Sequence, residues 1–104
     1  MNFKGSLPNL ILQNLSRGSN HGYRIAQEIK QTSKGVLDFK EGTLYPALHS
    51  LEGKKLITSS TRLENGRERR YYKLTDKGRK VLVKEREEWH QFSGAISGLL
   101  KEAT

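Results

Sequence analysis

The amino-acid sequence predicts a mainly α-helical domain with one small β-hairpin, in the order helix, helix, helix, hairpin, long helix. Apolar residues recur at helical spacing over most of the first 52 residues and again after residue 76. Between these parts, an Asn-Gly pair at 65–66 separates two runs rich in β-branched and aromatic residues, which is typical of a hairpin. With 104 residues and no cysteine, the chain fits a single domain that needs no disulfide.

Each of the first three helices has a suitable cap and a glycine at its end. The predicted pairs of cap and final glycine are Ser6 and Gly18, Ser19 or Asn20 and Gly35, and Thr43 and Gly53. The apolar positions at helical spacing are Phe3, Leu7, Leu10, Ile11 and Leu15, then Ile25, Ala26 and Ile29, then Leu44, Leu48 and Leu51. Pro8 and Pro46 fall near the starts of their helices, where a missing backbone N–H costs little.

The hairpin is predicted over residues 56–63 and 68–75. Its Asn65-Gly66 turn favours type I′, because both central residues of that turn need a positive φ. Alternation along the second strand places Arg70, Tyr72 and Leu74 on one face and Arg69, Tyr71 and Lys73 on the other. The two neighbouring arginines therefore point to opposite faces. We expect one to bind phosphate and the other to pair with Glu64 or Glu68.

The last helix is predicted to begin after a Thr75 cap and to run to about Leu100. Its apolar stripe consists of Leu82, Trp89, Phe92, Ile96 and Leu99. Because the three-helix core is already closed, this stripe needs another surface to cover it. We expect two chains to pair through the stripe as a homodimer, with Gly94 and Gly98 allowing close approach of the helices.

Most of the positive charge lies in one segment. The chain has 19 Lys and Arg residues against 11 acids, a net charge of +8, and residues 53–80 hold ten of the bases against three acids. A solvated charged surface is one explanation, but this concentration favours an electrostatic contact with a polyanion. Composition alone would also suit a ribosome-associated or membrane-surface protein.

Several functional classes are disfavoured. The chain has no apolar run of the roughly 20 residues that a membrane span needs and no signal-peptide layout, so we expect a cytoplasmic protein without membrane contact. It has no Gly-rich phosphate loop, nucleophile elbow or plausible triad, so we expect no enzymatic activity and no cofactor. The Glu87-x-x-His90 spacing matches part of a di-metal motif but is common on surface helices, and we expect no metal.

The predicted order of elements is the layout of a winged helix-turn-helix. The motifs with the greatest weight are Gly22-Tyr23, Gly-Thr-Leu-Tyr-Pro-Ala-Leu at 42–48, Leu51-Glu52, and Arg-Arg-Tyr-Tyr at 69–72 leading into Leu74-Thr75 and Gly78. On these motifs the chain resembles the PadR family of bacterial transcriptional regulators over almost its whole length, and in particular its shorter subfamily with a single C-terminal helix. Glu68 departs from the family, which often has proline there.

The DNA-binding residues expected from this layout lie on the third helix and the hairpin. They are Lys40, Thr43, Tyr45, Pro46 and His49, together with Arg67, Arg69 and Arg70. Tyr45 could instead pack against the second helix, and His49 could be an ordinary surface histidine. Asn20 and His21 open the second helix, whose N–H groups would also suit a phosphate.

The resemblance implies a dimeric, sequence-specific DNA-binding regulator that works at the bacterial nucleoid. We expect a repressor that binds double-stranded, pseudo-palindromic DNA and is relieved by a small aromatic effector. Residues 1–75 would form the DNA-binding unit and residues 76–104 the dimerisation helix, within one compact unit. Trp89, with Phe92, either stacks on the effector, as a tryptophan does in drug-responsive relatives, or serves only as interface core. The alternative function is a winged-helix module that binds RNA or a protein, without an effector.

Overall fold

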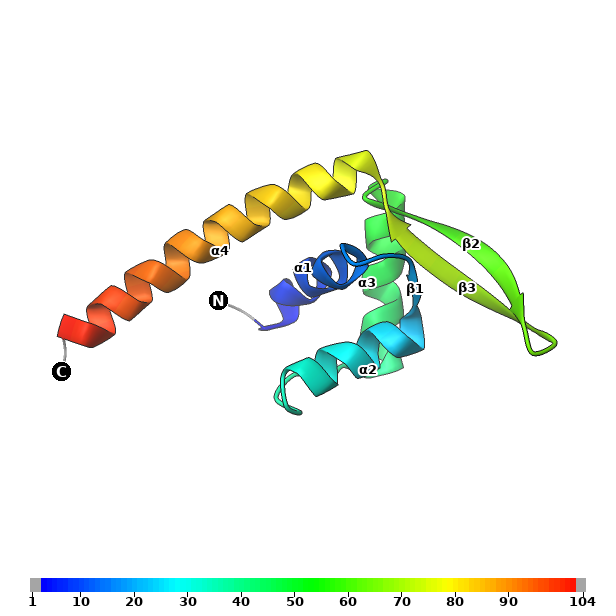
Figure 1. The fold of residues 1–104 in the computed structure, drawn as a ribbon, viewed down its shortest axis with the longest axis horizontal. Helices are drawn as coiled ribbons and strands as arrows, with labels where there is room; N and C mark the ends of the chain where they lie inside the picture. The colour runs from blue at the N-terminus through cyan, green and yellow to red at the C-terminus, as the bar shows by residue number, and fades with distance from the viewer. Residues whose placement is uncertain (1–2, 103–104) are drawn as a thin grey trace.

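The structure is a computed structural model that describes residues 3–102. The first three helices pack together with a small sheet at one side, and the hairpin and the last helix project in opposite directions from this body (Figure 1). The elements are α1 (Phe3–Leu15), β1 (Asn20–His21), α2 (Gly22–Thr32), α3 (Glu41–Gly53), β2 (Ile57–Glu64), β3 (Arg67–Leu74) and α4 (Asp76–Glu102). The predicted fold class, a winged helix-turn-helix with a long C-terminal helix, is confirmed.

The sheet has three antiparallel strands in the order β1-β3-β2, so β3 is the central strand. The pairing between β2 and β3 follows from the turn, where Asn65 and Gly66 have φ values of 50° and 79°, as type I′ requires. This register sets Arg62 opposite Arg69. The two-residue strand β1 was not predicted. Its pairing with Tyr71 and Tyr72 depends on residues about 50 positions away in the chain.

The beginnings of the first three helices differ from the prediction. Helix α1 starts at Phe3, so Ser6 lies within it, and the side chains of Phe3 and Ser6 lie outside the described part of the chain. Helix α2 begins at Gly22 and is capped by His21, whose side chain accepts the N–H of Arg24, so the predicted caps Ser19 and Asn20 lie before the cap position. Helix α3 starts at Glu41, and Lys40 occupies the cap position. The backbone carbonyl oxygen of Lys40 accepts the N–H groups of Thr43 and Leu44. Thr43 is therefore a helical residue.

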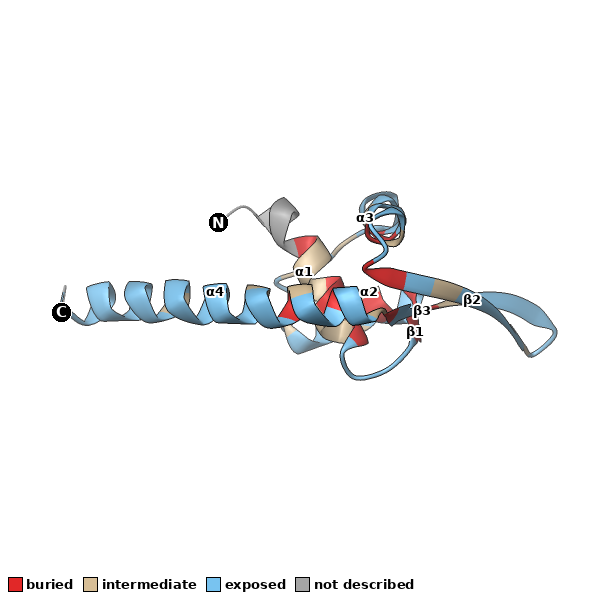
Figure 2. Cartoon of the chain, turned by 90° about the horizontal axis from the view of Figure 1, so that it is seen from above, coloured by how far each residue is buried: buried red, intermediate tan, exposed pale blue. Residues whose placement is uncertain are grey.

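The core lies where α1, α2, α3 and the inner face of the sheet meet, as the burial colours show (Figure 2). It includes most of the predicted apolar positions from Leu7 onward, which are buried: Leu7, Ile11, Leu15, Ile25, Ile29, Leu44, Leu48 and Leu51. Leu82 also belongs to it, with 4% of its surface exposed. Its assignment to a dimer interface is therefore wrong, because the first turns of α4 pack on the body of the same chain.

Helix α4 is joined tightly to the base of the hairpin. The predicted cap is confirmed: the Thr75 hydroxyl oxygen accepts the N–H of Gly78 at 3.0 Å, and the same hydroxyl donates to the Lys55 carbonyl at 2.7 Å. Gly78 has no room for a side chain, since a Cβ there would lie 2.0 Å from the carbonyl oxygen of Leu56. These contacts set the direction in which α4 leaves the body.

The molecule is elongated, with extents of 57 × 29 × 21 Å and a radius of gyration of 15.5 Å. A compact domain of this length would have a radius near 13 Å. The difference comes from α4 and the hairpin, which extend beyond the core (Figures 1 and 2). No helix within residues 3–102 is both long and apolar enough to cross a membrane.

Candidate nucleic-acid interface

One side of α3 is free for contact with a partner. Leu44, Leu48 and Leu51 face the core, and the opposite side of the helix is exposed. The exposed residues on α3 include Thr43, Tyr45, Pro46 and His49, and Lys40 is exposed just before the helix. The residues predicted to read DNA from this helix are therefore all accessible: Lys40, Thr43, Tyr45 and Pro46 lie at its N-terminal end, the part that enters a major groove in helix-turn-helix proteins, and His49 lies two turns further along.

Tyr45 joins α3 to the start of α2. A Cβ at residue 22 would lie 3.1 Å from both Cε1 and the hydroxyl oxygen of Tyr45, so the ring packs directly against Gly22. Tyr45 nevertheless keeps 37% of its surface exposed. The packing role that the sequence left open is thus present, and it leaves part of the ring available for an outside contact.

The hairpin presents four arginines around its outer half. Arg67, Arg69 and Arg70, as predicted, are exposed, and Arg62 joins them from the neighbouring strand. The Arg62 guanidinium lies 4.2 Å from the centre of the Tyr71 ring, and its Nη2 donates to the Ser19 hydroxyl at 3.0 Å. Arg62 was not singled out from the sequence, although counting back from the Asn65-Gly66 turn places it opposite Arg69.

The two adjacent arginines on β3 have different surroundings. Arg69 Nη1 lies 3.8 Å from a Glu64 carboxylate oxygen, a pairing that the sequence offered as one possibility. Among the described residues, Arg67 and Arg70 form no ion pair. The Glu64 carboxylate also accepts the Tyr71 hydroxyl, and this hydrogen bond raises the pKa of Tyr71. Arg67 and Arg70 therefore have no acidic partner in the part of the chain that the structure describes.

His21 was a secondary candidate from the sequence and occupies a central place in the structure. Only 8% of its surface is exposed, its Nδ1 accepts the backbone N–H of Arg24 at 3.3 Å, and its ring meets Tyr71 edge-on at 5.5 Å. Burial, and then the charge of Arg69, lower its pKa below 6.5. His21 is therefore neutral near pH 7.

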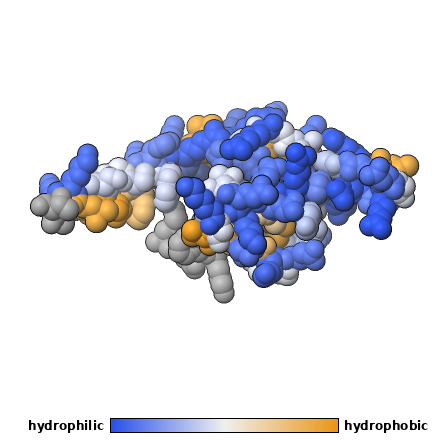
Figure 3. Space-filling view, turned by 60° about the horizontal axis from the view of Figure 1, so that its bottom comes forward, coloured by the Kyte–Doolittle hydropathy of each residue, from blue (hydrophilic) through white to orange (hydrophobic). Residues whose placement is uncertain are grey.

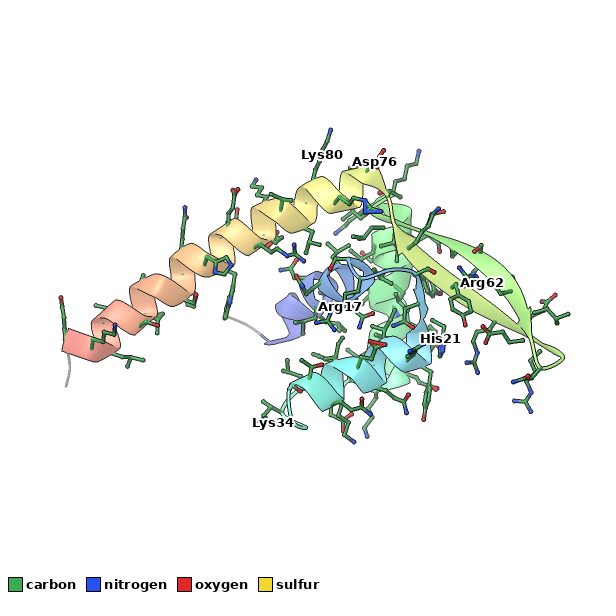
Figure 4. The ribbon with its side chains drawn as sticks, viewed as in Figure 1. Arg17, His21, Lys34, Arg62, Asp76 and Lys80 are labelled. Atoms are coloured by element: carbon green, nitrogen blue, oxygen red, sulfur yellow. The ribbon has the colours of Figure 1, made fainter. Side chains whose placement is uncertain are left out.

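The ten basic residues of segment 53–80 form two groups, one on the outer half of the hairpin and one around its base. Arg62, Arg67, Arg69 and Arg70 lie on its outer half, while Lys54, Lys55, Lys73, Lys77, Arg79 and Lys80 lie near its base. Arg62 and Lys80 mark the two groups in the stick view (Figure 4). Strands of eight residues are about 25 Å long, so the two ends of the hairpin cannot contact the same phosphate.

The outer part of α4 carries an uncovered apolar stripe. Trp89, Phe92, Ile96 and Leu99 are 40–63% exposed, and the Trp89 and Phe92 rings lie 6.0 Å apart. Figure 3 shows this apolar band along the free end of α4. Beside it, an open groove of about 690 Å³ lies between α1 and α4. Its lining includes Leu10, Leu37, Leu82, Glu88, Trp89 and Phe92.

Comparison with known proteins decides the family. The model of the "Transcriptional regulator PadR-like family" matches residues 11–84, which include α3 and the whole hairpin. The chain belongs to the PadR-like family of transcriptional regulators. The resemblance inferred from the motifs is thereby confirmed, and membership implies DNA binding by the winged helix-turn-helix.

Individual relatives agree with this PadR-like assignment. The chain is 34% identical over 88 residues to "Transcriptional regulator Rv3488" of Mycobacterium tuberculosis, covering 85% of this chain and 79% of that protein. Among solved structures, smu.1704 of Streptococcus mutans is 38% identical with a TM-score of 0.83, covering 91% of this chain and 86% of that one. A PadR family transcription regulator of Clostridium difficile is 32% identical with a TM-score of 0.81, covering 92% and 99%.

Proposed function

We propose that this PadR-like regulator is a homodimeric repressor that binds a pseudo-palindromic operator and releases it when a small molecule binds at the dimer seam. The observation that supports sequence-specific binding is the exposed side of α3, which lies beside a hairpin whose Arg67 and Arg70 have no acidic partner within residues 3–102. In this proposal His49 and Tyr45 contact base edges or thymine methyl groups. Lys40 and Thr43 contact phosphates, and Pro46 packs against the groove wall.

The hairpin supplies contacts that do not depend on sequence. Arg67 and Arg70 have no acidic partner among the described residues and can reach a phosphate or a narrow minor groove. Arg69 can add to them by leaving Glu64, because an exposed ion pair of this length contributes little. In this proposal residues 1–75 form the DNA-binding unit and residues 76–104 form the dimerisation helix.

The homodimer is supported by the stripe of Trp89, Phe92, Ile96 and Leu99. A helix that projects from the core with four large apolar residues exposed gains stability when a second copy covers them. Two copies related by a two-fold axis would present their α3 helices about 34 Å apart, one turn of DNA. The operator would then contain an inverted repeat, at which the dimer acts on the bacterial nucleoid.

The effector is supported by the groove between α1 and α4. Trp89 and Phe92 offer aromatic faces beside apolar side chains, which suits a flat aromatic ligand, with Glu88 close to the same surface. A ligand at this place changes operator affinity only if it binds two dimer geometries with different affinity. Repression would then end when the ligand-bound geometry no longer matches the half-site spacing.

The deciding experiment incubates the protein with sheared genomic DNA at about 0.15 M salt and sequences the retained fragments. We expect a few promoter fragments that share an inverted repeat. Arg67→Ala should weaken binding to all sequences alike, whereas His49→Ala should relax preference at one operator position. Uniform retention, or retention of RNA in its place, would contradict the proposal and favour an interaction module.

The effector is tested by the protein's own fluorescence. Trp89 is the only tryptophan in the chain, so its emission reports directly on this groove. Titration with planar aromatic compounds should quench it, and the compounds that quench should also weaken operator binding. Quenching without any change in operator affinity would show a site that is not regulatory.

A further inference from the structure

A cluster of polar side chains lies at the junction between the start of α2 and the hairpin. These side chains are not among the residues of α3 that are proposed to contact bases. The members of the cluster are Ser19, His21, Arg62, Arg69 and Tyr71. His21 lies at the start of α2, on the side that faces the hairpin with Arg62 (Figure 4). Because Tyr45 packs on Gly22, the first turn of α3 lies beside the same junction.

Both ring nitrogens of His21 face hydrogen-bond donors. The backbone N–H of Arg24 points to Nδ1 at 3.3 Å, and Nη1 of Arg69 lies 3.1 Å from Nε2. A neutral imidazole has only one accepting nitrogen, and neither a backbone N–H nor a guanidinium can accept. Capping of α2 assigns the accepting role to Nδ1. With Nδ1 in the accepting role, Nε2 carries the hydrogen and faces a second donor, Nη1 of Arg69.

No carboxylate in the surroundings relieves this mismatch. The charged groups that face His21 are Arg69 and Glu64 from the hairpin and Arg24 and Glu28 from α2. Glu28 is held by Arg24 at 3.2 Å and by the amides of Asn14 and Asn20. Glu64 is bound to the Tyr71 hydroxyl. The Nε2–H group of His21 thus lacks an acceptor among the described residues.

We propose that this junction binds one phosphate of the DNA backbone, with His21 Nε2–H and the Arg69 guanidinium as its main ligands and Arg62 with Ser19 at its edge. The inference rests on the proposed DNA-binding function and adds a site between the two DNA-facing elements. A phosphate oxygen accepts from both His21 and Arg69, which converts a contact between two donors into two charge-assisted hydrogen bonds. The positive end of the α2 dipole adds to the attraction.

The position of this site in the fold allows a DNA strand bound by α3 to reach it. A DNA strand that passes from the groove occupied by α3 toward the hairpin crosses the start of α2, since Tyr45 and Gly22 bring these elements together. Arg69 covers the buried Nε2 in the free protein and is itself about half exposed. Rotation of Arg69 toward an arriving phosphate uncovers Nε2 and loses only a long, partly solvated pairing with Glu64.

A matched pair of substitutions separates the two roles of His21. In His21→Asn, the side-chain oxygen can still cap α2, but no group remains at the place of Nε2. In His21→Gln, the longer amide can donate near the place of Nε2, but the cap is lost. We expect His21→Asn to melt near the wild-type temperature and to bind the selected operator about ten-fold more weakly for each half-site, or about 100-fold for the dimer, as for one hydrogen bond to a charged group in each protomer. His21→Gln should melt earlier than His21→Asn but bind the operator more tightly.

Neutral methylphosphonates in the operator, introduced one phosphate at a time, then locate the contact. Wild-type protein should lose affinity at one further phosphate per half-site to which His21→Asn is insensitive. Arg69→Gln should lower the salt slope by about 0.9 for each half-site, or about 1.8 for the dimer, whereas His21→Asn leaves it unchanged. Binding of His21→Asn as tight as that of the wild type, or an unchanged methylphosphonate profile, overturns the proposal.

Two controls keep this result distinct from the function itself. Arg67→Ala should weaken operator binding whether or not the junction binds a phosphate. If Arg67→Ala weakens binding and His21→Asn does not, only the phosphate site is refuted. Absence of operator binding by the wild type refutes the function and the site together. If His21→Asn does not fold, the ¹⁵N spectrum of the wild-type histidines decides: an Nδ1–H tautomer of His21 in the free protein overturns the proposal.

Discussion

The contact between Gly78 and the backbone of Leu56 allows a direct test of how α4 is joined to the hairpin. A Cβ at residue 78 would lie 2.0 Å from the Leu56 carbonyl oxygen and 3.2 Å from Cδ2 of Leu74. The same carbonyl accepts the N–H of Thr75 at 3.1 Å. Because the obstacle is backbone, Gly78→Ala must displace the start of α4 by more than about 1 Å to restore an ordinary van der Waals separation.

Two costs and one gain decide the size of this effect. Overpacking costs about 1–3 kcal/mol, and loss of the hydrogen bond between Thr75 and Leu56 costs about 1 kcal/mol. Alanine regains about 1 kcal/mol over glycine within a helix. The free energy of unfolding of Gly78→Ala should therefore fall by about 1–3 kcal/mol, which lowers the melting temperature of a domain of this size by about 5–20 °C.

Thermal and urea unfolding at equal protein concentration measure this change, with Gly53→Ala as the matched control. Gly53 is the last residue of α3, and no heavy atom lies within 4 Å of the place where its Cβ would be. The control should be as stable as the wild type or up to about 1 kcal/mol more stable. A Gly78→Ala protein as stable as the control would refute the close approach and the direction it sets for α4.

Three further predictions concern the cap, the buried histidine and the stripe on α4. Thr75→Val should lower the free energy of unfolding by about 1 kcal/mol, because Gly78 loses its acceptor, whereas Thr75→Ser should keep most of it; urea unfolding checks both. Because the pKa of His21 is lowered in the fold, the unfolded chain binds more protons below about pH 6.5, so stability should fall as the pH drops through that value. Melting curves between pH 5 and 8 test this, and in His21→Asn the melting temperature should change less with pH over the same range. Trp89→Asp should convert the proposed dimer to monomer in light scattering, while Gln91→Asp on the same helix should not; a monomeric wild type contradicts the interface.

The parts of the fold that the sequence predicted correctly depend on nearby residues. The Asn65-Gly66 turn, its type I′ geometry and the Thr75 cap involve residues no more than three positions apart. Helical spacing likewise identified the inward leucines of α3. The exposed DNA-facing residues then follow, since they occupy the opposite side of the same helix.

The helix starts were harder to predict because several residues near each start can act as caps. Ser19, Asn20 and His21 all carry side chains that can accept from a helix N–H group. Asn20 and His21 both pair with β3, so the helix begins only at Gly22, directly after this pairing, and the cap position falls on His21. The decision thus came from the sheet and not from cap preference.

By itself, the sequence determined the order of elements, the hairpin turn, the concentration of positive charge and the family. These features depend on local backbone preferences, on the 3.6-residue helical period and on composition, all of which can be read from the order of residues in one chain. Only the tertiary structure decided that Leu82 belongs to the core, that Gly78 must lack a side chain, and that His21 meets Arg69. Each of these depends on atoms brought together from distant positions in the chain, here 48 residues apart for His21 and Arg69.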